Sequence, residues 1–164
     1  RVVTATTRAA RPAEVHGEHY FFLKKADFEK RIQKGDFIEY AQVHGNYYGT
    51  LKSEIKKGLS KGHDLLMNID VQGAAAYRKL NKKAGPLQNR IVSIFILPPS
   101  IATLKKRLLG RGTSDTAELK RRLKTALKEI PCAGKFDYAF VSDTRQMDLK
   151  RAQAIYLAEK CRNR

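Results

Sequence analysis

The sequence predicts an α/β protein built on a parallel sheet with helices on both faces. Two nearly unbroken apolar runs, "DLLMNID" (64–70) and "RIVSIFIL" (90–97), have the composition of strands that are buried on both sides. A helical pattern follows each run, and strands that alternate with helices favour parallel pairing. The residues before position 63 are richer in short strands, so we expect a smaller mixed α/β part ahead of the parallel layer.

Glycines set the ends of the elements in the first part of the chain. Gly35 ends one helical stretch, and Gly62 ends a second in which Leu51, Ile55 and Leu59 recur at helical spacing. "DFIEYAQV" alternates as a strand does, whereas glycines bracket "GNYYGT", where we expect a loop. The expected strands are 1–8, 20–22 and 36–43, and the expected helices are 25–35 and 51–62.

The second part alternates regularly between helices and strands. We expect a helix at "VQGAAAYRKL" after the first apolar run. After "PPS" the expected elements are helices at about 100–109 and 115–130, a strand at 137–143 and a final helix from about 145. No internal repeat or low-complexity linker divides the chain, so a single domain over 1–164 is expected.

Composition limits the classes of function. A chain of 164 residues, 42% hydrophobic, can bury one core, and its longest apolar run is far shorter than the roughly 18 residues of a membrane span. The net charge of +17 attracts phosphates and nucleic acids alike, but most lysine-rich runs fit solvated helix faces. Cys132 and Cys161 fit no metal or redox spacing, so we expect free thiols and a reducing, cytoplasmic location.

Two places carry candidate binding chemistry. Arg8 and Arg11 lie three residues apart beside a turn, and two guanidiniums suit a multiply charged anion. Asn68 and Asp70 end the first apolar run, at the strand edge where open parallel sheets bind ligands. A carboxylate there faces a ligand or a metal-bound water, or it caps the next helix. We favour the ligand, and Gly73 then permits a close approach.

Five stretches in order resemble one family: "TTRAARPAEVHGEHYFF", "GDFIEYAQVHGNYYGT", "NIDVQGA", "IFILPPS" and "LKKRLLGRGT". Together they are similar to the guanylate kinases over essentially the whole chain. The resemblance implies a P-loop phosphotransferase fold with a core, a small GMP-binding subdomain and a helical lid, which transfers the γ-phosphoryl of ATP to GMP. The implied limits are 4–62 for the GMP-binding subdomain, 63–103 and 126–164 for the core, and 104–125 for the lid.

The resemblance also implies how GMP is bound. Its phosphate would be held by Arg8 and Arg11, with the hydroxyls of Tyr20 and Tyr48. Guanine presents two adjacent donors, N1–H and the 2-amino group, which a carboxylate can accept together, whereas adenine has an acceptor at the matching ring nitrogen. The implied readers of the base are Glu39, assisted by Thr50, Thr4 and Asp70.

The lid would supply arginines to the transferring phosphate, where negative charge spreads over the equatorial oxygens. The implied catalytic residues are Arg107, Arg111 and Arg122, and the implied ATP contacts are Arg107, Arg111 and Ser142. Arg121 is expected to face solvent. The expected hinges are Gly110 and Gly112, and Asp115 with Glu118 would form a capping box at the helix restart.

Four departures from the family pattern bear on activity. The P-loop motif GxxxxGK(S/T) is absent, so we expect no kinase activity from these 164 residues and a missing segment directly upstream. Asn68 stands where the family usually carries an acid near magnesium, so no residue is assigned to a metal and Mg²⁺ is expected with ATP. Ser142 replaces a usual asparagine, and Ala13 replaces a common turn glycine.

Two alternatives come from other classes of function. The same fold without catalysis serves as a module that binds phosphorylated protein partners, but such modules tend to lose the base-reading acids, and Glu39 and Asp70 are kept here. Nucleic-acid binding has only the net charge in its favour, because no stacking platform for single strands is visible. The expected partners are therefore GMP and ATP, with no nucleic acid and no membrane, in a monomer or homodimer.

Overall fold

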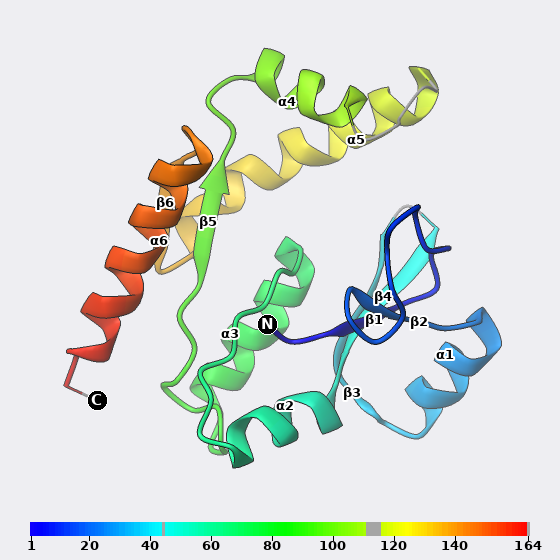
Figure 1. The fold of residues 1–164 in the computed structure, drawn as a ribbon, viewed down its shortest axis with the longest axis vertical. Helices are drawn as coiled ribbons and strands as arrows, with labels where there is room; N and C mark the ends of the chain where they lie inside the picture. Colours follow the sequence, from blue (N-terminus) through cyan, green and yellow to red (C-terminus); the bar gives the residue numbers. More distant parts are fainter. Residues whose placement is uncertain (44, 111–115, 164) are drawn as a thin grey trace. The chain divides into compact units, whose positions relative to one another are not determined.

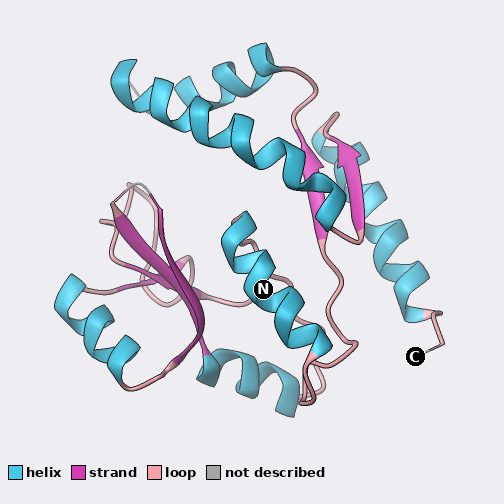
Figure 2. Cartoon of the chain, turned by 180° about the vertical axis from the view of Figure 1, so that it is seen from behind, coloured by secondary structure: helices cyan, strands magenta, loops and turns pink. Residues whose placement is uncertain are grey.

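The computed structural model describes residues 1–43, 45–110 and 116–163. The chain forms two compact units, Arg1–Lys82 and Lys83–Arg164. Each unit has its own sheet and its own helices (Figures 1 and 2). No helix among the described residues is long and apolar enough to cross a membrane.

The first unit contains a four-stranded sheet with the order β2-β1-β4-β3. Strand β1 pairs in parallel with β2, whereas the β1–β4 and β4–β3 pairs are antiparallel. Three helices complete the unit, and α2 and α3 contact β4 and β3, respectively. The elements are β1 (Thr4–Thr6), β2 (Tyr20–Phe22), α1 (Lys25–Gln33), β3 (Phe37–Val43), β4 (Asn46–Leu51), α2 (Lys52–Ser60) and α3 (Val71–Lys82).

An aromatic stack between α1 and the sheet forms the core of this unit. Phe28 is fully buried, with its ring 4.3 Å from that of Phe37 and 5.2 Å from that of Tyr47, both nearly parallel to it. Ala5 and Leu51 complete the buried cluster from β1 and β4. Helix α1 therefore covers one face of the sheet, and the opposite face is left for other groups.

The second unit contains a parallel pair of strands, β5 and β6, and the first of them lies in the apolar run 90–97, as predicted. Ser100 begins α4 by accepting a hydrogen bond from the Thr103 amide, and Thr144 begins α6 by accepting one from the Met147 amide. The elements are β5 (Ile94–Leu97), α4 (Ile101–Leu109), α5 (Thr116–Glu129), the 3₁₀ helix η1 (Ile130–Lys135), β6 (Tyr138–Val141) and α6 (Arg145–Lys160).

Two expectations about elements were wrong. The stretch 45–50 is not a loop, because most of it is strand β4, which forms a hairpin with β3. The hairpin needs a residue with positive φ, which Gly45 provides at 84°. The run 64–70 is not a strand. The Val2 amide donates a hydrogen bond to the Leu66 carbonyl at 2.9 Å, but a strand needs a continuous ladder of such bonds with a neighbouring strand.

Gly49 in β4 shows how closely the core face is packed. A Cβ atom at Gly49 would lie 2.9 Å from Cδ1 of Phe37 and 3.0 Å from the Glu39 carbonyl oxygen. The ring of Phe37 crosses the sheet directly over this glycine. The second glycine of "GNYYGT" is thus required by close approach, not by a turn.

We predict that Gly49→Ala destabilises the protein by about 1–3 kcal/mol, because overpacking displaces the Phe37 ring or the β3 backbone. Urea unfolding followed by circular dichroism would measure the loss. Gly134→Ala is the matched control, since a Cβ there meets nothing within 4 Å. If the two variants have the same free energy of unfolding, the packing at Gly49 is not as described.

Candidate functional site

A β-bulge places Glu39 on the face of the sheet opposite the core. Phe37 is paired with Leu51, and Glu39 is paired with Thr50, so two steps along β3 match one step along β4. In a regular strand residues two apart share a face, and Glu39 would point into the apolar core with Phe37. The extra residue, Ile38, turns the Glu39 side chain to the opposite face of the sheet, where it lies beside Thr50.

The register brings five of the predicted site residues to this one face. Tyr48 and Thr50 alternate with the core-facing residues of β4, and Thr4 lies opposite Tyr20 in the neighbouring pair of strands. We call this surface the polar face. It carries Thr4, Tyr20, Glu39, Tyr48 and Thr50.

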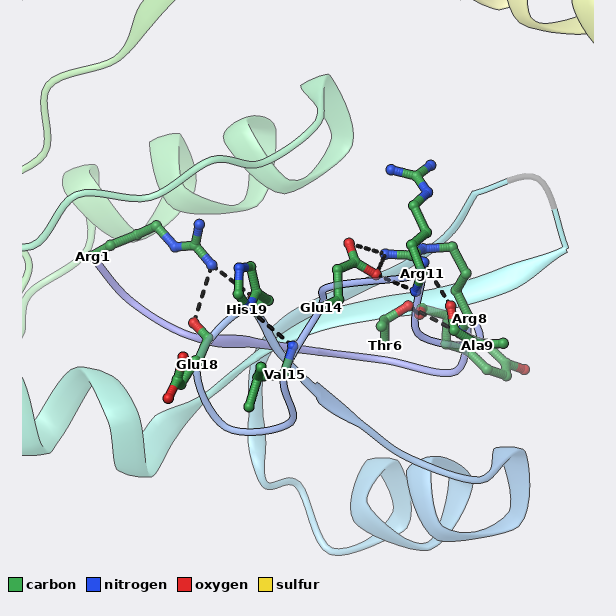
Figure 3. Close-up of polar contacts among 10 residues, drawn as sticks. Arg1, Thr6, Arg8, Ala9, Arg11, Glu14, Val15, Glu18 and His19 are labelled. Atoms are coloured by element: carbon green, nitrogen blue, oxygen red, sulfur yellow. Dashed lines mark hydrogen bonds and ion pairs between the residues drawn. The ribbon is translucent and has the colours of Figure 1, made fainter. Parts of the chain in front are cut away.

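Arg8 is fixed at one end of the polar face. Its Nη2 donates to both carboxylate oxygens of Glu14 at 2.9 Å, and its Nη1 donates to the Ala9 carbonyl at 2.6 Å (Figure 3). Its guanidinium carbon lies 5.6 Å from the ring centre of Tyr20 and 5.8 Å from that of Phe22, within cation–π range. The side chain is only 17% exposed. Arg8 is thus a preorganised cation and not a mobile surface residue.

Glu14, which sequence reasoning missed, joins the two arginines. It also accepts the backbone N–H of Arg11 at 2.7 Å, while the Arg11 guanidinium points away from it (Figure 3). This N–H and the Arg8 guanidinium lower the Glu14 pKa, although burial opposes them. Burial alone would lower the Arg8 pKa, but Glu14, with a smaller effect of Tyr48, raises it. The available signal was an acid three residues after Arg11 in a proline turn.

The turn that carries Glu14 contains a strained residue. Ala13 has a φ of 67°, in the left-handed region where a side chain costs roughly 1–2 kcal/mol. The glycine expected at this turn would avoid that cost. The turn nevertheless places Glu14 against Arg8. Tyr20, whose ring lies beside the Arg8 guanidinium, packs edge-on against Tyr48, with the ring centres 6.3 Å apart.

Glu39 occupies a second, more buried part of the polar face. Its Oε1 accepts a hydrogen bond from the Thr50 hydroxyl at 2.7 Å. A Cβ on Gly73 of α3 would lie 3.3 Å from both Glu39 Oε2 and Asp70 Oδ1, so only glycine lets the helix approach these carboxylates so closely. Burial raises the Glu39 pKa, and the neighbouring Asp70 adds to the rise, whereas Thr50 opposes it.

Asp70 caps helix α3, accepting the Gly73 amide on Oδ1 at 2.8 Å. Asp70 therefore caps the helix, and in the same position its carboxylate lies beside that of Glu39. Tyr77, one turn after Gly73, is 4% exposed and its hydroxyl has no hydrogen-bond partner within the described part of the chain. Burial strongly raises the Tyr77 pKa; the nearby Thr50 hydroxyl opposes this, and Glu39 adds to it.

The predicted ATP and lid residues lie in the second unit. Arg107 of α4 donates to the Ser142 hydroxyl at 3.0 Å, and Ser142 is buried at the end of β6. Arg122 of α5 pairs with Glu118 one turn earlier, and Arg121 is exposed, as expected. Outside the described residues lie the predicted catalytic Arg111, the predicted hinge Gly112 and Asp115 of the expected capping box.

Comparison with known proteins identifies the family. A family model described as guanylate kinase matches residues 1–157. A guanylate kinase of Clostridium tetani (strain Massachusetts / E88) is 44% identical over 160 residues, covering 98% of this chain and 74% of that protein. A guanylate kinase of Clostridium perfringens (strain SM101 / Type A) is 46% identical, with 98% and 71% covered.

A solved structure agrees with these relatives. The crystal structure of guanylate kinase from Anaplasma phagocytophilum superposes with a TM-score of 0.82 at 32% identity, covering 99% of this chain and 76% of that one. The chain belongs to the guanylate kinase family.

The raised pKa of Glu39 predicts that its charge destabilises the fold. Below the ordinary glutamate pKa the side chain is protonated in both folded and unfolded states, and the cost appears as the pH rises through the folded-state pKa. We therefore expect Glu39→Gln to raise the melting temperature at pH 7, where the cost is present. At pH 4 this advantage should shrink, and melting curves at both pH values would test it.

Glu14→Gln is the control of opposite sign. Its pKa is lowered, so its ionised form stabilises the fold, and this contribution is lost as the pH falls through the folded-state pKa. We expect this variant to be less stable than wild type at pH 7. Two variants with the same pH dependence would contradict the assigned environments.

Proposed function

We propose that the chain acts as a guanylate kinase, an ATP:GMP phosphotransferase that gives GDP and ADP, and that its first unit recognises GMP. The observation that carries the proposal is the polar face of the first unit, where a fixed arginine lies at one end and a half-buried carboxylate lies on β3. Family membership supports the reaction.

Arg8 and Arg11 would hold the phosphate of GMP. Glu14 occupies Nη2 of the Arg8 guanidinium and the Ala9 carbonyl takes one proton of Nη1, which leaves the Nε proton and the second Nη1 proton for an anion. Arg11 offers a guanidinium that points away from Glu14. Two cations against one carboxylate leave a net positive charge, which suits a phosphate dianion better than either arginine alone.

Glu39 would read the base. Its ionised carboxylate can accept N1–H and the 2-amino group of guanine together, with Thr50, Thr4 and Asp70 assisting. Adenine would present a ring acceptor to the same carboxylate, leaving buried polar groups unpaired, and such mismatches can discriminate by 10⁴-fold or so. Tyr48 and Thr50 are two residues apart on β4, about 7 Å, so phosphate and base groups are separated along the polar face.

The lid arginines would serve the donor side. We propose that Arg107, Arg111 and Arg122 stabilise charge on the transferring phosphate, with Arg107, Arg111 and Ser142 contacting ATP. The 164 residues contain no GxxxxGK(S/T) motif, so transfer needs a phosphate cradle from outside them. No group of three His, Cys, Asp or Glu gathers within the described residues, so Mg²⁺ would arrive on the ATP phosphates.

The alternatives make different demands on the same surface. A module for phosphorylated proteins would use the arginines but has no use for a half-buried carboxylate whose charge costs stability, so Glu39 favours the enzyme. The comparisons offer that alternative no support. The proposed partners are GMP and ATP, without nucleic acid, and the proposed form is a cytoplasmic monomer or homodimer.

The phosphate assignment predicts the effect of single substitutions. Arg8→Ala and Arg11→Ala should each weaken GMP binding by at least about 1.5 kcal/mol, more than tenfold, because each removes charge-assisted hydrogen bonds. Calorimetric titration with GMP would measure the loss. Arg31→Ala is the matched control, an exposed arginine on α1 paired with Asp36. If both clamp variants keep the affinity of the control, the phosphate lies elsewhere.

The base assignment predicts a change of selectivity. Glu39→Gln replaces one acceptor by a donor that faces guanine, so GMP affinity should fall by about 100-fold or more while AMP affinity changes little. Parallel titrations with GMP and AMP give the ratio. Asp27→Asn, at an exposed position on α1, is the control for the loss of one negative charge. Equal losses for both nucleotides would show that Glu39 has a structural role and does not read the base.

A further inference from the structure

A three-residue polar network ties together three elements of the second unit. The Ser142 hydroxyl, after β6, donates to Asp148 Oδ2 at 2.7 Å and accepts from Arg107 Nη2 at 3.0 Å. Asp148 Oδ1 accepts the Asp143 amide at 2.8 Å. Ser142 is 4% exposed, so its two bonds are protected from water. Helices α4 and α6 are thus joined through one buried hydroxyl.

The direction of these bonds is set by Asp148. A serine hydroxyl has one proton, and once Asp148 accepts it only lone pairs remain for Arg107, which can only donate. Without Asp148 the hydroxyl is free to rotate, and its proton can point at the guanidinium. The backbone N–H of Asp143 and the Ser142 hydroxyl lower the Asp148 pKa, against the effect of burial, and Arg151 and Arg107 contribute further.

The network lies at a ligand-binding edge of the fold. The Ser142 amide donates to the Leu97 carbonyl at 2.8 Å, which extends the parallel β5–β6 pair by one bond at its carboxyl end. Ligands of parallel sheets bind at this edge. Arg107 itself is exposed: one N–H of its guanidinium, on Nη2, is held by Ser142, while the side chain remains accessible to solvent.

We propose that Asp148 is a positioning residue that, through Ser142, fixes the guanidinium of Arg107 for the polyphosphate of the nucleotide donor. The inference rests on the proposed function of Arg107. An unrestrained surface arginine loses rotamer freedom when it binds an anion, and an arginine already held loses less. Asp148 therefore restricts the guanidinium of Arg107 indirectly, through Ser142, whereas Glu14 restricts that of Arg8 by a direct hydrogen bond.

The test follows Arg107 directly. Nitrogen-15 NMR of the arginine side chains in the intact chain reports rotation of the Arg107 guanidinium, and titration with tripolyphosphate is read from the Ser142 amide. In Asp148→Ala we expect faster guanidinium rotation and about three- to tenfold weaker tripolyphosphate binding, as for a freed long side chain. Asp148→Asn should lie between, because its amide oxygen can still accept the Ser142 proton.

Two comparisons make the test decisive. Asp143→Asn is the matched control, because its exposed carboxylate reaches only the edge of the network, 4.0 Å from Arg151, and it should behave as wild type. Asp148→Ala should add no further loss in an Arg107→Ala background. Unchanged Arg107 rotation in Asp148→Ala, or an additive loss in the double variant, overturns the positioning role. A rigid Arg107 whose removal leaves tripolyphosphate binding intact overturns the proposed function of Arg107 instead.

Discussion

The β-bulge at Ile38 is the constraint on which the candidate site depends. Phe37 must enter the stack with Phe28, because that stack is the core of the first unit. Glu39 follows two positions later and would be carried into the same apolar core by a regular strand. One additional residue in β3 sends it to the polar face, where Thr50 meets it. A change of register by one residue would exchange the core and the site.

The half-buried carboxylate of Glu39 lies where the fold is packed closely. Glu39 is raised in pKa by burial and by Asp70, so the folded state holds it in an unfavourable environment. Gly73 brings α3 close enough for this to happen, and Gly49 lets Phe37 close the other face. The aromatic core thus supports a group that on its own weakens the fold, as binding sites that trade stability for recognition do.

The sequence predicted most of the helices and both strands of the parallel pair, but not the hairpin, the bulge or two of the acidic residues. Helical patterns predicted α1–α6, with glycine stops at the ends of α1 and α2, and the apolar composition of 90–97 predicted the first strand of the parallel pair. The hairpin strand β4 was missed because its glycines resemble loop glycines, while Gly49 serves packing. The bulge could not be predicted, since it leaves no mark in the alternation of "DFIEYAQV". Glu14 and Asp148 were missed because their partners are set by turns and tertiary packing, not by spacing.

Acidic residues have an organising role in this basic chain. With 33 basic and 16 acidic residues, the chain attracts anions at long range through its net charge alone. Such attraction orients nothing, because exposed lysines and arginines are mobile and screened by salt. Glu14 converts Arg8 into a fixed group through two 2.9 Å contacts, and Asp148 acts on Arg107 through Ser142. Where a carboxylate fixes an arginine, directly at Arg8 or through Ser142 at Arg107, general electrostatic attraction becomes a directed site.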